Sequence, residues 1–341
     1  FAFLIIYTIL AIVVGYPLML SEIALGRKTQ KAAIEAYKEA DHRFKFNGVL
    51  QTIVPWFLIC FYCTFGGYIT KYLFESIQAL FVKNSVLNTG DPGALFGGMI
   101  GNVGNSVAWM TAFLLLTMVI VFGGVSGGIE KFCKIAMPAL FFLLIAVVIR
   151  SCTLPGAGPG LKFLFYPDLT MWKKDFFEVV RLAGGQMFFS LSLASGCIIA
   201  YGSYLGKKEN LESNAAIITA GDSIVAVLAG MAIMPAVFAF GLKPSGGPGL
   251  LFVSMTTVFQ SMGTTGKFFQ LAFWLLVFFA ALSSSIGMME AGISAILDSR
   301  VKAGKPASRV KVSVIMALAA FVGNFLTTAD SLGGNPKMNW F

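Results

Sequence analysis

The chain has 341 residues, of which 57% are hydrophobic and only 12% are charged. This composition is typical of a polytopic membrane protein rather than of a soluble domain. The formal net charge of +9 would suit an acidic partner, but most basic residues lie in short loops between apolar stretches, as membrane topology requires. We therefore expect the protein to contact the lipid bilayer and not to bind nucleic acid.

Eight apolar stretches are long enough to cross a bilayer, which takes about 20 apolar residues. Basic loops follow every second stretch, so these loops are expected on the cytoplasmic side. The expected spans, all within one transmembrane domain over 1–341, are 1–25, 48–81, 106–123, 133–150, 176–204, 211–240, 268–297 and 309–327. The chain begins and ends inside apolar or aromatic sequence, at Phe1 and Phe341, so we expect a piece of a longer protein.

The cysteines and the single histidine do not favour metal binding or catalysis. Cys60 and Cys63 form one CxxC pair without a second pair, which argues against a zinc site and for buried thiols. His42 lies in a basic loop, away from any nucleophile or metal-ligand cluster. We do not expect an enzyme.

Three polar residues stand out within the apolar stretches. Glu22 lies near the end of the first, where it either has a functional role or bonds loop amides or Arg27. Tyr62 is mid-span, where its hydroxyl needs a partner. Asp222 is the only charge in its stretch after Glu212; its insertion costs about 2.5–3.5 kcal/mol, which a bound cation or protonation would offset. Alternatively, Asp222 caps a kink.

The stretch from Leu182 to Tyr204 is apolar but unsuited to a continuous helix. Its centre, from Ser190 to Gly196, is dense in hydroxyl groups and ends on glycine. Unwound backbone at membrane depth is tolerated only where it lines a cavity, and its free carbonyls and hydroxyls suit a cation or an ammonium group. In the alternative interpretation, these serines bond back to their own helix.

Three motifs together resemble the bacterial branch of the neurotransmitter:sodium symporter family: GGQMFFSLSLASG (184–196), GPGLLFVSM (247–255) and FFAALSSSIGMME (278–290). The resemblance implies an all-α polytopic membrane protein with the LeuT-type inverted-repeat fold. It implies a discontinuous helix around 177–204 and places the chain over the family's helices two to nine, truncated at both ends. The second motif is similar to the family's fourth outer loop, a lid over the outer vestibule.

The resemblance also implies a function. We expect a sodium-coupled symporter of an amino acid that works by alternating access in the bacterial inner membrane, with a homodimer as a possible assembly. A transporter of an amine or osmolyte, or a non-transporting receptor or channel, is the alternative. Ser195 and Met288 in the pocket wall suggest room for a large apolar or aromatic side chain.

Site residues carry over from the matching motif positions. A first sodium ion would bind Ser190 and Asp222, and a second would bind the Ala280 carbonyl with the Ser283 and Ser284 hydroxyls, since a hard cation takes oxygen ligands. The residues expected around the substrate are Leu58, Tyr62, Phe189, Ser190, Ser192, Ser195, Ser284 and Met288, with the Tyr62 hydroxyl donating to the substrate carboxylate.

Two further expectations follow from the resemblance. Asp298 would form part of a cytoplasmic gate braced by Tyr204. Tyr7, Gln186 and Ser190 match three chloride-contacting positions of chloride-dependent members, whereas Asp222 takes the place of an asparagine and can balance sodium by its own charge. We therefore expect no chloride requirement, with Asp222 taking up a proton on the return step. A register slip of one residue would put Gly221 at the ligand position instead.

Overall fold

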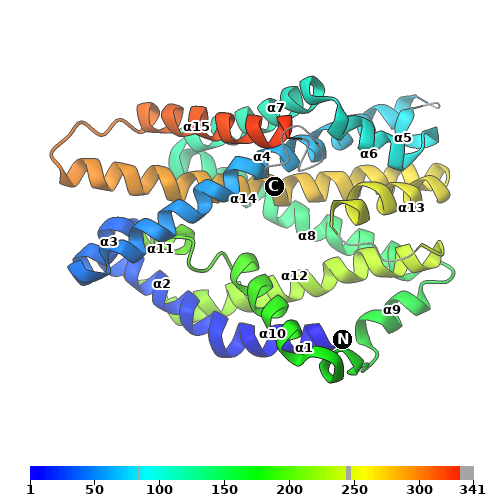
Figure 1. Ribbon diagram of the computed structural model, residues 1–341, viewed down its shortest axis with the longest axis horizontal. Coiled ribbons are helices and arrows are strands. Elements are labelled where there is room, and N and C mark those ends of the chain that lie inside the picture. Colours follow the sequence, from blue (N-terminus) through cyan, green and yellow to red (C-terminus); the bar gives the residue numbers. More distant parts are fainter. Residues whose placement is uncertain (83–84, 243–246, 331–341) are drawn as a thin grey trace. The chain divides into compact units, whose positions relative to one another are not determined.

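The computed structural model describes residues 1–82, 85–242 and 247–330, and in these ranges every regular element is a helix (Figure 1). This confirms the all-α prediction. The residues group into two compact units. Unit 1 comprises Phe1–Leu58, Phe165–Val227 and Gly287–Met316; unit 2 comprises Ile59–Leu164, Leu228–Ile286 and the chain from Ala317 onward.

Seven helical stretches of the described residues are long and apolar enough to cross a membrane. They are Ala2–Thr29 (α1, η1 and α2), His42–Phe81 (η2 and α4, Lys45–Phe81), Val103–Phe122 (α7), Val125–Cys152 (η3 and α8, Glu130–Cys152), Leu211–Ala239 (α12), Thr264–Lys302 (α14) and Arg309–Ala329 (α15). Within the first, α1 is Ala2–Leu10, η1 is Ala11–Gly15 and α2 is Tyr16–Thr29.

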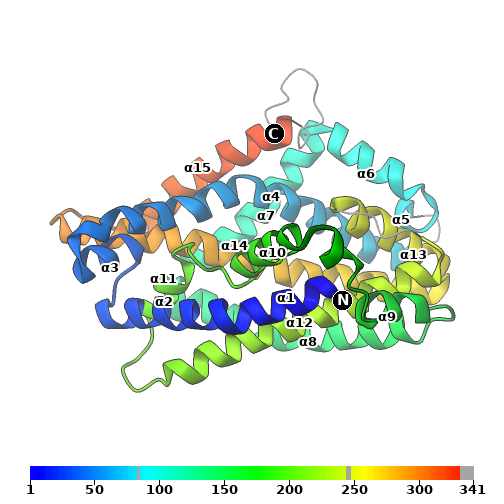
Figure 2. The ribbon, with the colours of Figure 1, turned by 60° about the horizontal axis from the view of Figure 1, so that its bottom comes forward.

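The remaining predicted span is a broken helix. It consists of α10 (Thr170–Ser190) and α11 (Cys197–Ser203), joined by a non-helical linker at 191–196 (Figure 2). The expected discontinuous helix is therefore confirmed. Its first half begins earlier than the predicted span, at Thr170, and bends at Asp175, where the backbone leaves helical geometry.

Short helices occupy the connections. They are α3 (Ala33–Ala40), α5 (Val86–Thr89), α6 (Pro92–Gly101), α9 (Gly158–Phe165), η4 (Leu250–Ser254) and α13 (Met255–Ser261). Helices α5 and α6 lie in the connection between α4 and α7. The lid-like motif forms η4 and the start of α13; the Gly246 that precedes it lies outside the described residues.

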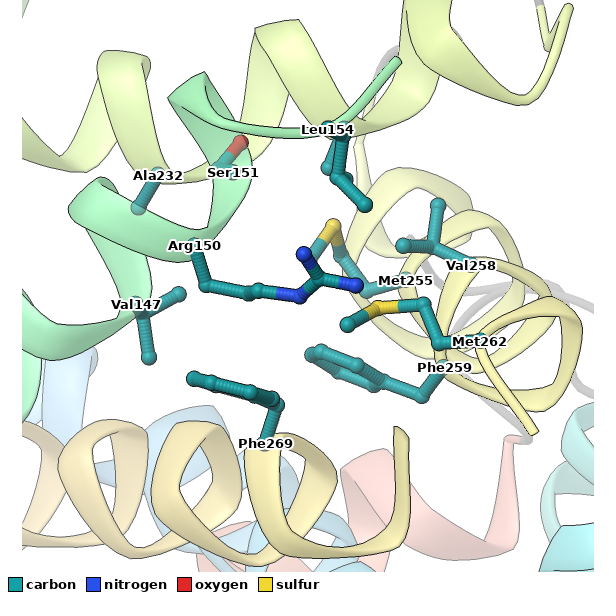
Figure 3. A pocket seen from close by; sticks show the side chains of 11 residues that line it. Val147, Arg150, Ser151, Leu154, Ala232, Met255, Val258, Phe259, Met262 and Phe269 are labelled. Atoms are coloured by element: carbon teal, nitrogen blue, oxygen red, sulfur yellow. The ribbon is translucent and has the colours of Figure 1, made fainter. Parts of the chain in front are cut away.

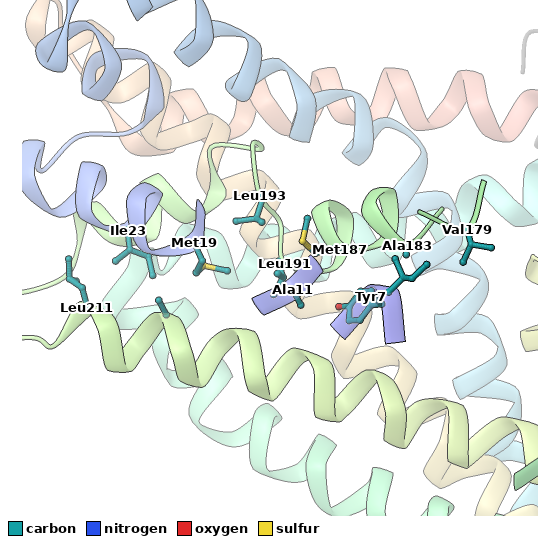
Figure 4. Close-up of a cluster of buried hydrophobic side chains, with 12 residues drawn as sticks. Tyr7, Ala11, Met19, Ile23, Val179, Ala183, Met187, Leu191, Leu193 and Leu211 are labelled. Carbon is teal, nitrogen blue, oxygen red and sulfur yellow. The ribbon is translucent and has the colours of Figure 1, made fainter. Parts of the chain in front are cut away.

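An apolar cluster in unit 1 packs α1 against α10 and holds the linker in place (Figure 4). Tyr7 and Ala11 face Ala183 and Met187 there, and Leu191 from the linker joins them. These side chains are nearly inaccessible, so the contact rests on close van der Waals packing between the helices. The first half of the broken helix and the start of its linker are thus packed against α1 and η1.

Helices α2 and α11 meet backbone to backbone in unit 1. A Cβ atom added at Gly26 would lie 2.2 Å from the Ile199 carbonyl oxygen, and one at Gly202 would lie 2.8 Å from the Ile23 carbonyl oxygen. Each helix therefore supplies a glycine where the other approaches, and neither glycine tolerates a side chain.

In unit 2, the C-terminal end of α8 contacts α14 through Arg150, whose guanidinium carbon lies 5.8 Å from the centre of the Phe269 ring (Figure 3). Met255 and Met262 flank the same guanidinium group, which suits a cation–π contact in an apolar setting. The cavity beside it has a volume of about 10 Å³, which is room for about one water molecule. It is too small for a solute.

Candidate ion and solute sites

The linker of the broken helix has an unusual backbone. Ser192 and Ala194 have φ values of 53° and 56°, a left-handed conformation that non-glycine residues rarely adopt, and Gly196 has a φ of 70°. The Ser195 hydroxyl donates to the Ser192 carbonyl at 2.5 Å and thereby closes the turn. Such strained backbone persists where its surroundings over-determine it, and it leaves peptide groups outside the helical ladder.

Glu22 on α2 is one of the residues that hold this linker in its conformation. Its Oε1 atom accepts a hydrogen bond of 2.9 Å from the Ala194 N–H and lies 3.5 Å from Gln51 Nε2. Of the two interpretations of Glu22, the structure therefore favours the partner for loop amides, and that loop is the linker itself. Gln51 also donates to the Tyr37 hydroxyl at 3.0 Å, and burial, together with the charge of Glu22, raises the pKa of Tyr37.

Asp222 lies where α12 passes the end of α10. Ser190 Oγ donates to Oδ1 of Asp222 at 2.7 Å, and the Tyr7 hydroxyl donates to Oδ2 at 2.7 Å. One carboxylate thus takes a charge-assisted hydrogen bond from each of two helices. Gln186 is exposed on α10, and among the described residues no hydrogen bond joins it to Asp222.

On α14 in unit 2, the hydroxyls of Ser283 and Ser284 close on the Ala280 carbonyl, at 2.9 and 3.1 Å. The structure therefore brings together the three oxygen atoms predicted for a second sodium ion. Serine hydroxyls in helices commonly bond the carbonyl three or four residues back, so an ion would have to replace these bonds. The Tyr62 hydroxyl of α4 faces the Ser284 side chain.

The remaining predicted substrate residues all belong to unit 1. Phe189, at the end of α10, has an exposed fraction of 58%. Ser195 is buried, and its hydroxyl donates to the Ser192 carbonyl within the linker. It could therefore contribute to a solute pocket through its small size and not through its hydroxyl. Leu58, Ser192 and Met288 are half-buried.

The predicted gate residues have partners other than each other. The Tyr204 hydroxyl donates to Glu290 Oε1 at 2.7 Å, whereas Asp298 Oδ2 accepts from the Ala32 N–H at 2.6 Å. The structure therefore has Tyr204 bonded to Glu290 and not, as predicted, bracing Asp298. Sequence reasoning missed Glu290 and its partner Arg309. The presence of a carboxylate inside the apolar stretch 268–297 could have indicated that Glu290 needs a partner.

The structure is similar to the crystal structure of MhsT in complex with L-phenylalanine, with a TM-score of 0.87 and 34% sequence identity over 97% of this chain and 73% of that one. Together with the broken helix, this similarity defines a multi-pass membrane transporter of the LeuT-type fold. The model of the sodium:neurotransmitter symporter family matches residues 1–91 and 80–341. The chain belongs to that family, whose members are sodium-coupled transporters.

Relatives in the family include uncharacterised sodium-dependent transporters. One from Bacillus subtilis is 36% identical over 94% of this chain, and one from Methanocaldococcus jannaschii is 30% identical over 97%. The sodium- and chloride-dependent GABA transporter 2 of Rattus norvegicus is 25% identical over 97%. The chain spans 69%, 68% and 62% of the length of these three relatives. A multi-pass location in the bacterial plasma membrane fits the Bacillus relative.

Proposed function

We propose that this chain forms part of a sodium-coupled amino-acid symporter that works by alternating access. The observation that carries the proposal is the Asp222 carboxylate at the break of the helix, held by hydroxyls from Ser190 and Tyr7 at 2.7 Å each. A carboxylate inside a membrane span is costly unless a cation offsets its charge. The broken helix beside it has backbone groups outside helical geometry, and its carbonyls would join the coordination.

In unit 1, a sodium ion would take the Asp222 carboxylate together with the carbonyl and hydroxyl of Ser190. These ligands are hard oxygen atoms, and the carboxylate supplies one negative charge to one positive ion. In unit 2, a second sodium ion would take Ala280, Ser283 and Ser284, which offer oxygen atoms without net charge. The two ions would then differ in their dependence on a protein charge.

For the substrate, we propose an amino acid with a large apolar or aromatic side chain. In unit 1, the linker carbonyls and the Ser192 hydroxyl would bind an ammonium group; in unit 2, the Tyr62 hydroxyl would donate to a carboxylate. The support is the phenylalanine bound to MhsT and the small volume of Ser195. Ser195 together with the adaptable Met288 leaves room for a bulky group.

A zwitterion with more widely separated charges is the second candidate. It is favoured by relatives named as GABA and taurine transporters, which are 25% identical to this chain in rat and human. A competition panel in proteoliposomes that carry the full-length protein separates the two. Leucine, tyrosine and phenylalanine should compete best; stronger competition by glycine, GABA or taurine would rule out the first assignment.

Sodium coupling is tested by the Ser283→Ala, Ser284→Ala double variant. It removes two hydroxyl ligands, so sodium-driven uptake should be nearly lost and the sodium concentration for half-maximal uptake should rise by about tenfold or more, as expected for losing ligands to a charged group. The matched control is Ser285→Ala, on the same turn, whose hydroxyl instead contacts Thr117 at 2.8 Å. Wild-type sodium dependence in the double variant would show that the assignment is wrong.

A further inference from the structure

Asn324, on α15, contacts the backbone of α4 on both sides of Tyr62. Its Nδ2 donates to the Ile59 carbonyl at 2.7 Å, and its Oδ1 accepts from the Thr64 N–H at 3.1 Å. The two backbone groups are five residues apart, so one side-chain amide spans more than a helical turn. Asn324 is completely buried, with an exposed fraction of 0%.

Neighbouring groups of α15 reinforce this contact. The Thr327 hydroxyl donates to the Cys60 carbonyl at 3.1 Å, and the hydroxyls of Thr328 and Thr64 lie 3.0 Å apart. A Cβ atom at Gly323 would lie 2.3 Å from Cys60 Sγ, so only glycine permits this approach of the two helices. The segment from Ile59 to Thr64 of α4 is therefore joined to the segment from Gly323 to Thr328 of α15 by several hydrogen bonds within an apolar region.

This contact fixes the rotation of α4 at Tyr62. A polar side chain that enters the hydrogen-bond ladder of a helix changes its local course, and a buried amide is costly to leave unpaired. With about 100° between successive residues, Cys60 and Thr64 lie about 40° apart on one face of α4, and Tyr62 projects about 160° away from both of them. The Tyr62 hydroxyl faces Ser284 on α14.

We propose that Asn324 is a positioning residue for Tyr62. By holding the α4 turn between Ile59 and Thr64, Asn324 fixes the position and direction of the Tyr62 hydroxyl. This orientation is important because a hydrogen bond weakens steeply outside a narrow range of distance and angle. The inference rests on the proposed function, in which the Tyr62 hydroxyl donates to the carboxylate of the substrate. Asn324 itself does not touch the substrate.

The test is a double-mutant cycle on uptake of L-phenylalanine by the full-length protein in proteoliposomes. Asn324→Leu removes both bonds to α4, and we expect KM to rise about tenfold, as for the loss of one hydrogen bond to a charged group, with the maximal rate per protein within about twofold. The control is Thr70→Val, which removes a hydroxyl bond of 2.7 Å to the Gly66 carbonyl elsewhere on α4. It should leave KM unchanged.

In the Tyr62→Phe background, Asn324→Leu should raise KM by less than about twofold, because the hydroxyl that it positions is already gone. A further tenfold rise in that background would overturn the positioning role while leaving the proposed function intact. A Tyr62→Phe variant with wild-type KM would overturn the carboxylate assignment, and the positioning role with it. If Asn324→Leu does not fold, Asn324→Asp enters the same cycle, since it keeps the shape and the acceptor for the Thr64 N–H but loses the donor to Ile59.

Discussion

The Tyr204 hydroxyl and Glu290 are joined by a hydrogen bond of 2.7 Å, and Arg309 Nη2 approaches the second oxygen of the same carboxylate at 2.5 Å. The Glu290 side chain is 1% exposed and that of Arg309 is 27% exposed. A buried carboxylate is thus neutralised by a guanidinium that lies partly in solvent. Helices α14 and α15 are held together by this pair, and the end of α11 is tied to it through Tyr204.

Arg309→Leu should destabilise the protein strongly, because it leaves the Glu290 charge buried and unpaired. Removing one partner of a buried pair costs about 3–5 kcal/mol, and the partial exposure of Arg309 places the expected loss at the low end. Thermal unfolding in detergent measures it. Lys134→Leu breaks an exposed pair with Glu130, at 72% and 51% exposure, and should have almost no effect. Glu290→Gln added to Arg309→Leu should restore stability, and a failure to do so would contradict this explanation.

Uptake should not require chloride, and Asp222→Asn should make it chloride-stimulated. The substitution keeps an oxygen ligand and removes the negative charge that balances sodium. The Ser190 and Tyr7 hydroxyls, which now donate to Asp222, would then be free to donate to an anion. The measurement is uptake with gluconate replacing chloride. Wild-type uptake that collapses in gluconate would contradict the prediction.

Glu22→Leu should loosen the linker of the broken helix, because it removes the acceptor for the Ala194 N–H. The loss corresponds to about 1 kcal/mol for one hydrogen bond, so amide deuterium exchange over 191–196 should speed up by about fivefold or more. Glu22→Gln keeps an acceptor and should exchange more slowly than the leucine variant. Equal exchange in the leucine variant and the wild type would show that the linker is held by its apolar contacts alone.

Asp298→Ala should shift the balance of inward-open and outward-open states and leave the fold intact. Asp298 bonds the Ala32 N–H at 2.6 Å, just before α3, and thus connects the end of α14 to the loop after α2. Without that bond, a reporter cysteine on α11 should label faster from the cytoplasmic side. Lys302 bonds Glu35 of α3 nearby at 2.7 Å, and Lys302→Ala serves as the control for a general loosening of α3. Unchanged labelling in Asp298→Ala would count against a gate.

The break in the helix could be predicted because its cause is local. Three serines and a glycine between Ser190 and Gly196 cannot form a good helix in an apolar setting, and the structure leaves helical geometry there. Asp222 could also be singled out, because one carboxylate in an apolar stretch needs a partner. The local sequence does not say which partner, and the two hydroxyls come from residues 32 and 215 positions away.

The contacts of Tyr204 and Asn324 could not be predicted, because they depend on helix rotation and depth. Tyr204 reaches Glu290, about two helical turns before Asp298, and nothing in the apolar pattern distinguishes those two acceptors. Asn324 reads as an isolated amide in an apolar helix, and its two bonds to α4 join residues more than 250 positions apart. Such long-range pairings are set by packing, which periodicity does not specify.

The paired glycines Gly26 and Gly202 have a mechanical consequence. Since a Cβ atom on either glycine would overlap a carbonyl oxygen of the opposite helix, α2 and α11 pack through backbone atoms at this point. We expect the two helices to move together, with the change in dihedral angles taken up by the linker, where Ser192, Ala194 and Gly196 already have positive φ values. If the switch between outward-open and inward-open states involves a bend at the linker, α2 would move together with α11.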